Sequence, residues 1–411
     1  MKNMTVRYLL IALIVVILSA LGGWYIFLKR QQAAISENDV GRGAGLSQPF
    51  GAQVGSTYEN IVSSLSTPVG GTPPEGGGGA RLSQVGKTPT AGYGFLGGGP
   101  VQLRFIERGS GYVFDASAET YSLERRTKTL VPRTYEAIVT RSERVIMRGV
   151  DEEGTIVTTA GAIIASTSTA QEPGILSQTR LLDDISFIVM SPTGEESFFI
   201  VKGGTEASGF RAAWDGTKQK KVLASALAGW QSRWLPNDTI VIVQNAADAV
   251  AGSAYRVEKN GALSPLIRNV PGLTFLPHPR SSAVLYGESA GVLSLFARID
   301  DKSTSIELPV RTIADKCVWG PATSTRSALI AFCAVPQTAP PANFLDRWYR
   351  GEVHTADAWW RVDVSANSAE LLYTPGNETL DVEDPTIDEG GSYIAFKNAV
   401  DKSLWLLRIK E

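Results

Sequence analysis

The chain has 411 residues, 43% of them hydrophobic, which is enough for a large core in one long domain or two ordinary ones. Its 39 Lys and Arg residues against 41 Asp and Glu residues leave a net charge of −2, so the sequence lacks the basic footprint of a nucleic-acid-binding protein. Two His and two Cys residues leave little material for a zinc or haem site, and we expect no cofactor; a metal held only by carboxylates stays open.

The first apolar segment runs from Tyr8 to Leu28 and contains no charged residue over 21 positions. At about 1.5 Å per residue, a helix of this length crosses the hydrocarbon core of a bilayer. A cleaved signal peptide is the alternative, but its apolar region is usually about 7–15 residues long. We therefore expect a single-pass anchor at 8–28. The large domain that follows favours residues 1–7 in the cytoplasm and the remainder on the outer side of the cell membrane, although basic residues flank the span on both sides.

Residues 29–100 are rich in Gly, Ser, Thr, Pro and Gln. Such a composition cannot bury enough apolar surface to offset the entropy of ordering, so we expect a flexible tether. Within it, Gly86-Lys87-Thr88 resembles the end of a phosphate-binding loop, but the motif requires Gly where Arg81 stands. We therefore predict no nucleotide site there.

From residue 101 to residue 411 the pattern changes to short apolar runs separated by turn residues, which is typical of an all-β domain. A unit of about 44 residues recurs, and each copy offers about four short strands, as one blade of a β-propeller requires. We expect six copies that begin at Tyr135, Ile185, Trp230, Leu273, Cys317 and Val382.

Residues 102–131 offer three further strand candidates, so a seven-bladed ring is the first choice. Eight blades would follow if residues 160–184 formed extra strands, and six if residues 102–131 only completed the last blade. The last copy, "DPTIDEGGSYIAFKNAVDKSLWLLRIKE", stops after three strands. We expect the ring to close through a strand from about residues 94–106, such as "VQLRFIE".

The last copy, "PTIDEGGSYIAF…SLWLL", resembles the TolB-type, WD-like propeller repeat. The run "CVW…FCAVP…WYRGEV…WWRVDV" is similar to uncharacterised single-pass, membrane-anchored propeller proteins of candidate-phylum bacteria. The first resemblance implies a propeller over residues 135–411, and the second implies no known activity. TolB-type proteins carry an additional N-terminal domain where this chain has the predicted anchor and tether.

The segment "GESAG", residues 287–291, matches the G-x-S-x-G nucleophile motif, and chain order permits a set of Ser289, Asp300 and His354. The motif requires a helix after the serine, whereas "VLSLFARI" follows and is typical of a strand. A turn in a β-hairpin accounts for these residues. We therefore assign no catalytic residues.

Residues 336–358 form an insertion that contains Trp348, Tyr349, Arg350 and His354. Binding residues concentrate on long loops, and Trp, Tyr and Arg are the usual energetic anchors of interfaces, so these four are candidates for partner binding. The alternative is that the aromatic residues only hold the loop on the neighbouring blade.

Cys317 and Cys333 fall on the first and second strands of one predicted blade. A hairpin centred near residue 325 would place them opposite each other, and an oxidising compartment would favour a disulfide between them. Two buried thiols are the alternative.

These observations favour a membrane-tethered, extracytoplasmic propeller that acts as a non-enzymatic scaffold for a protein or cell-envelope component. The alternative is a propeller enzyme that acts on envelope glycans through carboxylates in its central channel.

Overall fold

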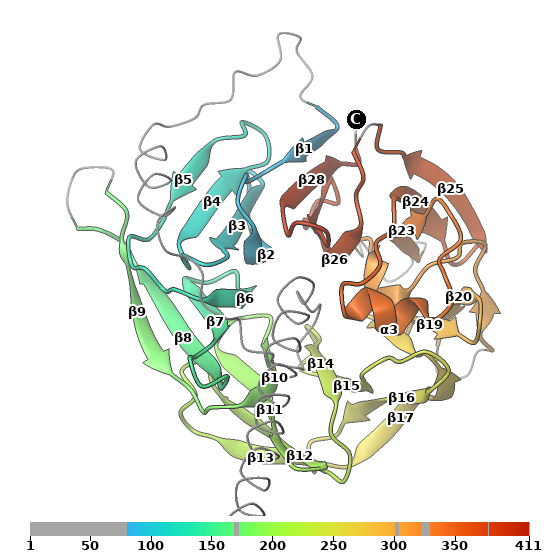
Figure 1. Cartoon of the computed structure of the whole chain (residues 1–411), viewed down its shortest axis with the longest axis horizontal. Coiled ribbons are helices and arrows are strands. Elements are labelled where there is room, and N and C mark those ends of the chain that lie inside the picture. Colours follow the sequence, from blue (N-terminus) through green and yellow to red (C-terminus); the bar gives the residue numbers. More distant parts are fainter. Residues whose placement is uncertain (1–79, 168–171, 301–303, 322–328, 377, 411) are drawn as a thin grey trace, which may run out of the picture.

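The computed structural model describes residues 80–167, 172–300, 304–321, 329–376 and 378–410. Within these residues the chain forms seven four-stranded antiparallel sheets arranged as blades around a central axis (Figure 1). The predicted all-β, seven-bladed propeller is thus confirmed, and the six- and eight-bladed alternatives are wrong.

In blades 1 to 6 the strands follow one another in chain order from the central axis outward, whereas the outermost strand of blade 7 comes from the start of the domain (Figure 1). Blade 1 comprises β2 (Thr90–Leu96), β3 (Gln102–Glu107), β4 (Val113–Ser117) and β5 (Leu123–Arg125), and blade 2 comprises β6 (Thr134–Val139), β7 (Arg144–Val150), β8 (Ile156–Ile164) and β9 (Ile175–Arg180). Blade 3 comprises β10 (Ile185–Met190), β11 (Glu196–Gly203), β12 (Glu206–Ala213) and β13 (Lys220–Ser225), and blade 4 comprises β14 (Trp230–Trp234), β15 (Ile240–Gln244), β16 (Ala251–Val257) and β17 (Leu263–Pro271). Blade 5 comprises β18 (Thr274–Pro277), β19 (Val284–Ser289), β20 (Leu293–Arg298) and β21 (Ile306–Glu307), and blade 6 comprises β22 (Cys317–Trp319), β23 (Ile330–Pro336), β24 (Asp357–Asp363) and β25 (Ser368–Tyr373). Blade 7 comprises β26 (Val382–Ile387), β27 (Tyr393–Asn398), β28 (Leu404–Arg408) and, from the start of the domain, β1 (Leu82–Gln84).

The ring closes through β1, which pairs with β28 as the outermost strand of blade 7. The expectation that residues 94–106 supply the closing strand is wrong, because "QLRFIE" forms β3, the second strand of blade 1. The three-residue strand β1 has too short an apolar pattern to stand out from the Gly-rich sequence around it. The propeller therefore begins near residue 82, inside the range expected to be tether.

The innermost strand of blade 1, β2, also lies in that range, so blade 1 is complete. Its Gly92 packs against the backbone of β6 so closely that an added Cβ would lie 1.8 Å from the carbonyl oxygen of Ala137. Glycine is therefore required there for the close approach of two blades, although the same glycines made the segment resemble a linker.

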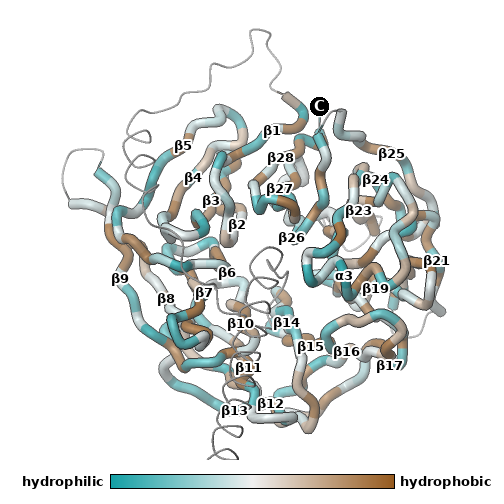
Figure 2. The backbone as a smooth tube through the Cα atoms, viewed as in Figure 1, coloured by the Kyte–Doolittle hydropathy of each residue, from teal (hydrophilic) through white to brown (hydrophobic). Residues whose placement is uncertain are grey.

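The hydrophobic core is divided into clusters that lie between neighbouring blades. Ile106 and Val145, for example, belong to the cluster between blades 1 and 2, and Phe396 belongs to the cluster between blades 6 and 7. Figure 2 shows hydrophobic stretches recurring along the strands around the whole ring. Since every blade is covered only by its neighbours, the closing pair β1–β28 is needed to complete the core.

One face of the ring carries every connection from the outermost strand of a blade to the innermost strand of the next, together with the turns between second and third strands. We call it the connection face. It bears the 3₁₀ turn η1 (Ala314–Lys316) and helix α3 (Phe344–Tyr349). In the part of the chain that the structure describes, no helix is long and apolar enough to cross a membrane; the predicted span at 8–28 lies outside that part.

Candidate functional site

The insertion between β23 and β24 lies on the connection face and contains helix α3. Phe344, Leu345 and Trp348 point from this helix into the propeller, with exposures of 2%, 0% and 2%. They form a small apolar cluster with Leu293 and Ile313 of blades 5 and 6. The helix is therefore held on the ring by its apolar side.

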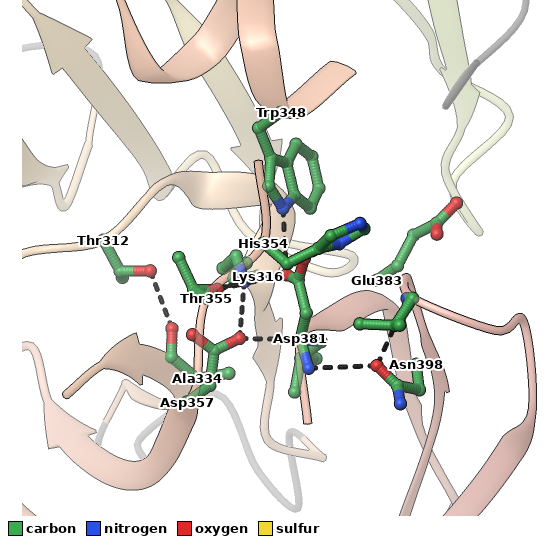
Figure 3. Close-up of polar contacts among 12 residues, drawn as sticks. Thr312, Lys316, Ala334, Trp348, His354, Thr355, Asp357, Asp381, Glu383 and Asn398 are labelled. Carbon is green, nitrogen blue, oxygen red and sulfur yellow. Dashed lines mark hydrogen bonds and ion pairs between the residues drawn. The ribbon is translucent and has the colours of Figure 1, made fainter. Parts of the chain in front are cut away.

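A fully buried ion cluster lies beneath the insertion. The Lys316 ammonium group contacts the carboxylate of Asp357 and donates hydrogen bonds to Asp381 Oδ1 and Thr355 Oγ1, both at 2.7 Å (Figure 3). The side chains of Lys316, Asp357 and Asp381 have no exposure to solvent. Removing one charge from such a cluster is costly, because its partners stay buried without compensation.

Asp381 is the hub that joins the insertion to blade 7. Its Oδ1 accepts a hydrogen bond from Trp348 Nε1, and its Oδ2 accepts one from His354 Nδ1, each at 2.9 Å (Figure 3). Its backbone N–H donates to Asn398 Oδ1 of β27 at 3.1 Å. The Lys316 ammonium also lies 5.2 Å from the centre of the Trp348 ring, a cation–π contact. One carboxylate thus positions both ends of the segment from α3 to His354.

His354 is the outermost member of the cluster. Lys316 lies between the carboxylates of Asp357 and Asp381, and His354 contacts the second of these carboxylates. The His354 side chain is 35% exposed, so this imidazole is the part of the cluster that meets solvent.

The four residues predicted to bind a partner separate into two pairs. Trp348 is buried, and the Tyr349 hydroxyl donates to the Asp315 carboxylate, so both aromatic residues hold the insertion on the ring. Arg350 is 55% exposed and pairs with Glu352 at 2.6 Å. Of the four predicted residues, Arg350 and His354 are therefore the two on the outer surface of the insertion.

Burial near the central axis raises the pKa of two neighbouring groups, the Asp315 carboxyl and the Tyr349 hydroxyl. Burial raises the pKa of Asp315 above its ordinary value, although the Tyr349 hydroxyl and Arg233 oppose the shift. Burial and the Asp315 carboxylate likewise raise the pKa of the Tyr349 hydroxyl. This hydroxyl therefore stays protonated and can donate to Asp315 at neutral pH.

Other carboxylates near the inner edge of the ring are paired with lysine. The Asp384 side chain is 67% exposed and lies 2.9 Å from Lys397, and Glu383 pairs with Lys402. Crowding by protein atoms acts to raise the pKa of Asp384, but the Lys397 ammonium outweighs it and the pKa lies below its ordinary value. A carboxyl held ionised in this way is not suited to act as a general acid.

Sequence reasoning missed Lys316, Asp357 and Asp381. Each is a charged residue directly at the start of a buried strand, which was the only signal available: Lys316 precedes "CVW", Asp357 opens "DAWWRVD" and Asp381 precedes β26. Their mutual contacts depend on the closed ring, so no local pattern could pair them.

The "GESAG" segment ends strand β19 and begins the hairpin turn to β20, so a β-hairpin accounts for it, as expected. The Ser289 hydroxyl donates to Asp248 Oδ1 at 2.6 Å, and Asp248 Oδ2 accepts from the backbone N–H of Asp346. Ser289 thus helps to fix the insertion, while His354 pairs with Asp381. Within the described ranges, no group of three His, Cys, Asp or Glu residues is arranged to hold a metal ion.

Cys317 and Cys333 are directly opposite each other in the pairing of β22 with β23. The structure joins them in a disulfide with Cα atoms 4.1 Å apart. The bond lies inside the core between blades 5 and 6, next to the strand that leads into the insertion.

A groove of about 910 Å³ lies elsewhere, between blades 3 and 4. Arg211, on its wall, pairs with Glu196 and Asp238 and covers the ring of Trp234 at 4.8 Å. Carboxylates and lysines both line the groove, so its wall is of mixed charge.

No protein-family model and no curated protein matches the sequence. Among solved structures, the chain is similar to a streptogramin B lyase, with 13% identity, a TM-score of 0.50 and coverage of 80% of this chain and 97% of the other. A catalytically inactive virginiamycin B lyase from Staphylococcus aureus with quinupristin gives 13% identity, a TM-score of 0.50 and coverage of 80% and 99%. The β-propeller domain of the Trilobed protease from Pyrococcus furiosus gives 8% identity, a TM-score of 0.47 and coverage of 79% and 99%. At such low identity the similarities to the two lyases show the propeller fold and nothing about activity, and the resemblance to TolB-type and candidate-phylum proteins stays a prediction.

Proposed function

We propose that this chain is a membrane-tethered, extracytoplasmic propeller that acts as a non-enzymatic scaffold and binds a protein or envelope component on its connection face. The observation that carries the proposal is the hub at Asp381, which fixes the insertion through Trp348 and His354. A loop fixed in advance loses little conformational entropy when a partner binds, so it can present Arg347 and Arg350 in one orientation.

The membrane tether rests on the sequence. The uncharged run from Tyr8 to Leu28 is long enough to cross a bilayer, and residues 29–79 would join it to the first strand of the ring. Localisation on the outer side of the cell membrane follows from the same segment. It also agrees with a disulfide between Cys317 and Cys333, since such bonds persist in oxidising compartments.

The second candidate, an enzyme that acts on envelope glycans, requires two carboxyl groups about 5–10 Å apart, one of them protonated. The pairing of Asp384 with Lys397 and of Glu383 with Lys402 favours ionised carboxylates in salt bridges over an acid–base pair. Incubation of the purified protein with isolated envelope glycans distinguishes the two: release of new reducing ends would favour the enzyme, and the scaffold predicts none.

A photo-crosslinking amino acid placed at position 350 in cells tests the binding face. The matched control is position 141, because Arg141 lies in the turn between β6 and β7 on the opposite face and is likewise 55% exposed and paired with a glutamate. We expect discrete crosslinked species from position 350 and none from position 141. Equal crosslinking from both positions, or none from position 350, would contradict the proposal. Deletion of the whole insertion is a poorer test, because it would leave Lys316 and Asp381 without Thr355, Trp348 and His354.

A further inference from the structure

Exposed aliphatic residues gather on the connection face. Of the eleven large hydrophobic residues that are exposed in the described part of the chain, six lie in connections or turns of this face. They are Leu130, Leu182, Leu227, Val250, Val292 and Val400, with exposures between 43% and 60%. Such residues lose unfavourable contact with water when another surface covers them, at about 25 cal/mol per Å² of apolar area. The face therefore offers several apolar contact points to a partner.

Four of these residues follow each other along one arc of the ring. Leu182 lies between blades 2 and 3, Leu227 between blades 3 and 4, Val250 in blade 4 and Val292 in blade 5. The arc thus starts beside blade 2 and ends beside blade 6, where the insertion begins.

The two ends of this arc carry opposite charge. At blade 2, an acidic sector consists of the exposed residues Glu152, Glu153, Asp183 and Asp184. Arg133 and Arg180 contact Glu152 and Asp183, and the half-buried Asp151 lies in the same turn as Glu152, so the sector stays negative by about three charges.

At blades 5 and 6, a basic sector consists of Arg311, Arg347 and Arg350. Glu352 pairs with both arginines of the insertion, and the half-buried Asp346 lies in the same helix, so this sector stays positive by about one charge. The two sectors are therefore opposite in sign.

This arrangement is self-complementary. A two-fold axis that lies in the plane of the face and passes through the middle of the arc exchanges its two ends. It would place the acidic sector of one copy against the basic sector of another, and the aliphatic residues near blade 4 against their own counterparts. Closed symmetry of this kind requires one patch to match itself, and charge complementarity fixes the orientation.

We propose that the connection face binds a second copy of this chain, in a two-fold dimer held by these charged sectors and by Leu182, Leu227, Val250 and Val292. The inference rests on the proposed function, because it names the partner of the same face. The test also shows whether a different protein or a lipid surface occupies the connection face instead.

The test is a charge exchange in the full-length protein, purified in detergent, with the mass of the protein part measured by sedimentation at 0.1 M salt. The first variant carries Glu152→Lys and Glu153→Lys, and the second carries Arg347→Glu and Arg350→Glu. We expect the natural chain to be a dimer, and each variant alone to dissociate at least about 10-fold more readily. A mixture of the two variants should form mixed dimers, because the basic sectors of the first then face the acidic sectors of the second. Arg141→Glu, on the opposite face, serves as the control and should leave the dimer unchanged.

Hydrophobic contacts are tested in parallel. Val250→Ser with Val292→Ser should weaken the dimer at least about 10-fold, whereas Leu371→Ser, at a residue of β25 that is 52% exposed, should not. A natural chain that stays monomeric at tens of micromolar, or variants that dimerise alone as well as in mixture, would overturn the inference.

The photo-crosslinks from position 350 separate the two proposals. Products of twice the chain mass support the dimer. Products with a different protein, or crosslinks to lipid only, would overturn the dimer. The first of these would leave the proposed scaffold function in place, and the second would remove the protein partner from it.

Discussion

Leu82 in β1 pairs with Leu407 in β28, so the last strand of the chain is held between the first described strand and the rest of blade 7. Leu407 is fully buried in the core between blades 6 and 7, and Leu406 faces blade 1. The seam of the ring is thus a three-residue ladder, Leu82 to Gln84, that completes two inter-blade cores at once.

We expect truncation after Ser403, which removes β28, to abolish cooperative unfolding of the whole propeller. The truncation exposes the cores on both sides of blade 7 and leaves β1 without a partner, and a repeat ring whose neighbours are uncovered loses its main source of stability. Thermal unfolding followed by circular dichroism measures this. The control is truncation after Ile409, which keeps β28 and should retain the transition. A sharp transition in the protein truncated after Ser403 would contradict the role of the seam.

We expect Lys316→Met to destabilise the protein by about 3–5 kcal/mol, since it leaves the carboxylates of Asp357 and Asp381 buried without a positive partner. Urea unfolding measures the loss, and hydrogen exchange of residues 344–356 should increase more than that of the other blades, because Asp381 holds the insertion. Lys220→Met, at an exposed residue of β13, is the matched control and should change stability by less than about 0.5 kcal/mol. A loss in the Lys316 variant no larger than in this control would contradict the cluster's structural role.

The architecture was readable from the sequence because a propeller repeats one unit, and the predicted starts at Ile185, Trp230, Cys317 and Val382 coincide with the innermost strands of four blades. The seam was not readable, because closure joins distant segments and β1 has only three residues. Gly92 lay in a range that was expected to be a flexible tether, whereas it packs closely against the next blade. Glycine is frequent both in linkers and where backbones approach closely, so its presence does not separate the two roles. The ion cluster was missed for a similar reason: Lys316 and Asp381 meet only after the ring has closed.

The buried residues of the insertion show a further limit. Trp348 and Tyr349 are the residue types that dominate interfaces, yet the same types are used to hold a loop on its own domain. Sequence composition cannot separate the two uses, because both need a large apolar surface with one polar group. The partners of that polar group, Asp381 for Trp348 and Asp315 for Tyr349, decide the matter.

We expect the purified, unreduced protein to show no mass increase when it is unfolded and treated with an alkylating reagent, because Cys317 and Cys333 are joined. After reduction, two alkyl groups should be added. For a separation of 16 residues, loss of the bond should lower the free energy of unfolding by about 3 kcal/mol. Protein expressed with its anchor segment deleted, and so kept in a reducing cytoplasm, supplies the contrast. Two alkyl groups on the unreduced protein from the native membrane would contradict the bond.

We expect Asp315→Asn to raise the stability at pH 7, and this gain to shrink as the pH falls. Burial raises the pKa of Asp315 above its ordinary value, so the folded protein binds a proton at this carboxyl more readily than the unfolded chain does. The contribution of Asp315 to stability is therefore present below the unfolded pKa and lost as the pH rises through the folded pKa. Asparagine removes the buried charge, and its side-chain oxygen can still accept the hydrogen bond from Tyr349.

The matched variant for this pH test is Asp215→Asn, at an exposed carboxyl whose pKa is lowered by hydrogen bonds from the side chain and backbone of Thr217. Here the sign is opposite, because a carboxyl with a lowered folded pKa stabilises the protein above the unfolded pKa and loses that contribution as the pH falls. Melting temperatures of both variants and of the natural chain, measured from pH 4 to pH 8, should therefore diverge in opposite directions as the pH rises. A loss of stability in Asp315→Asn at pH 7 that does not change with pH would mean that the charged carboxylate is needed beside Tyr349.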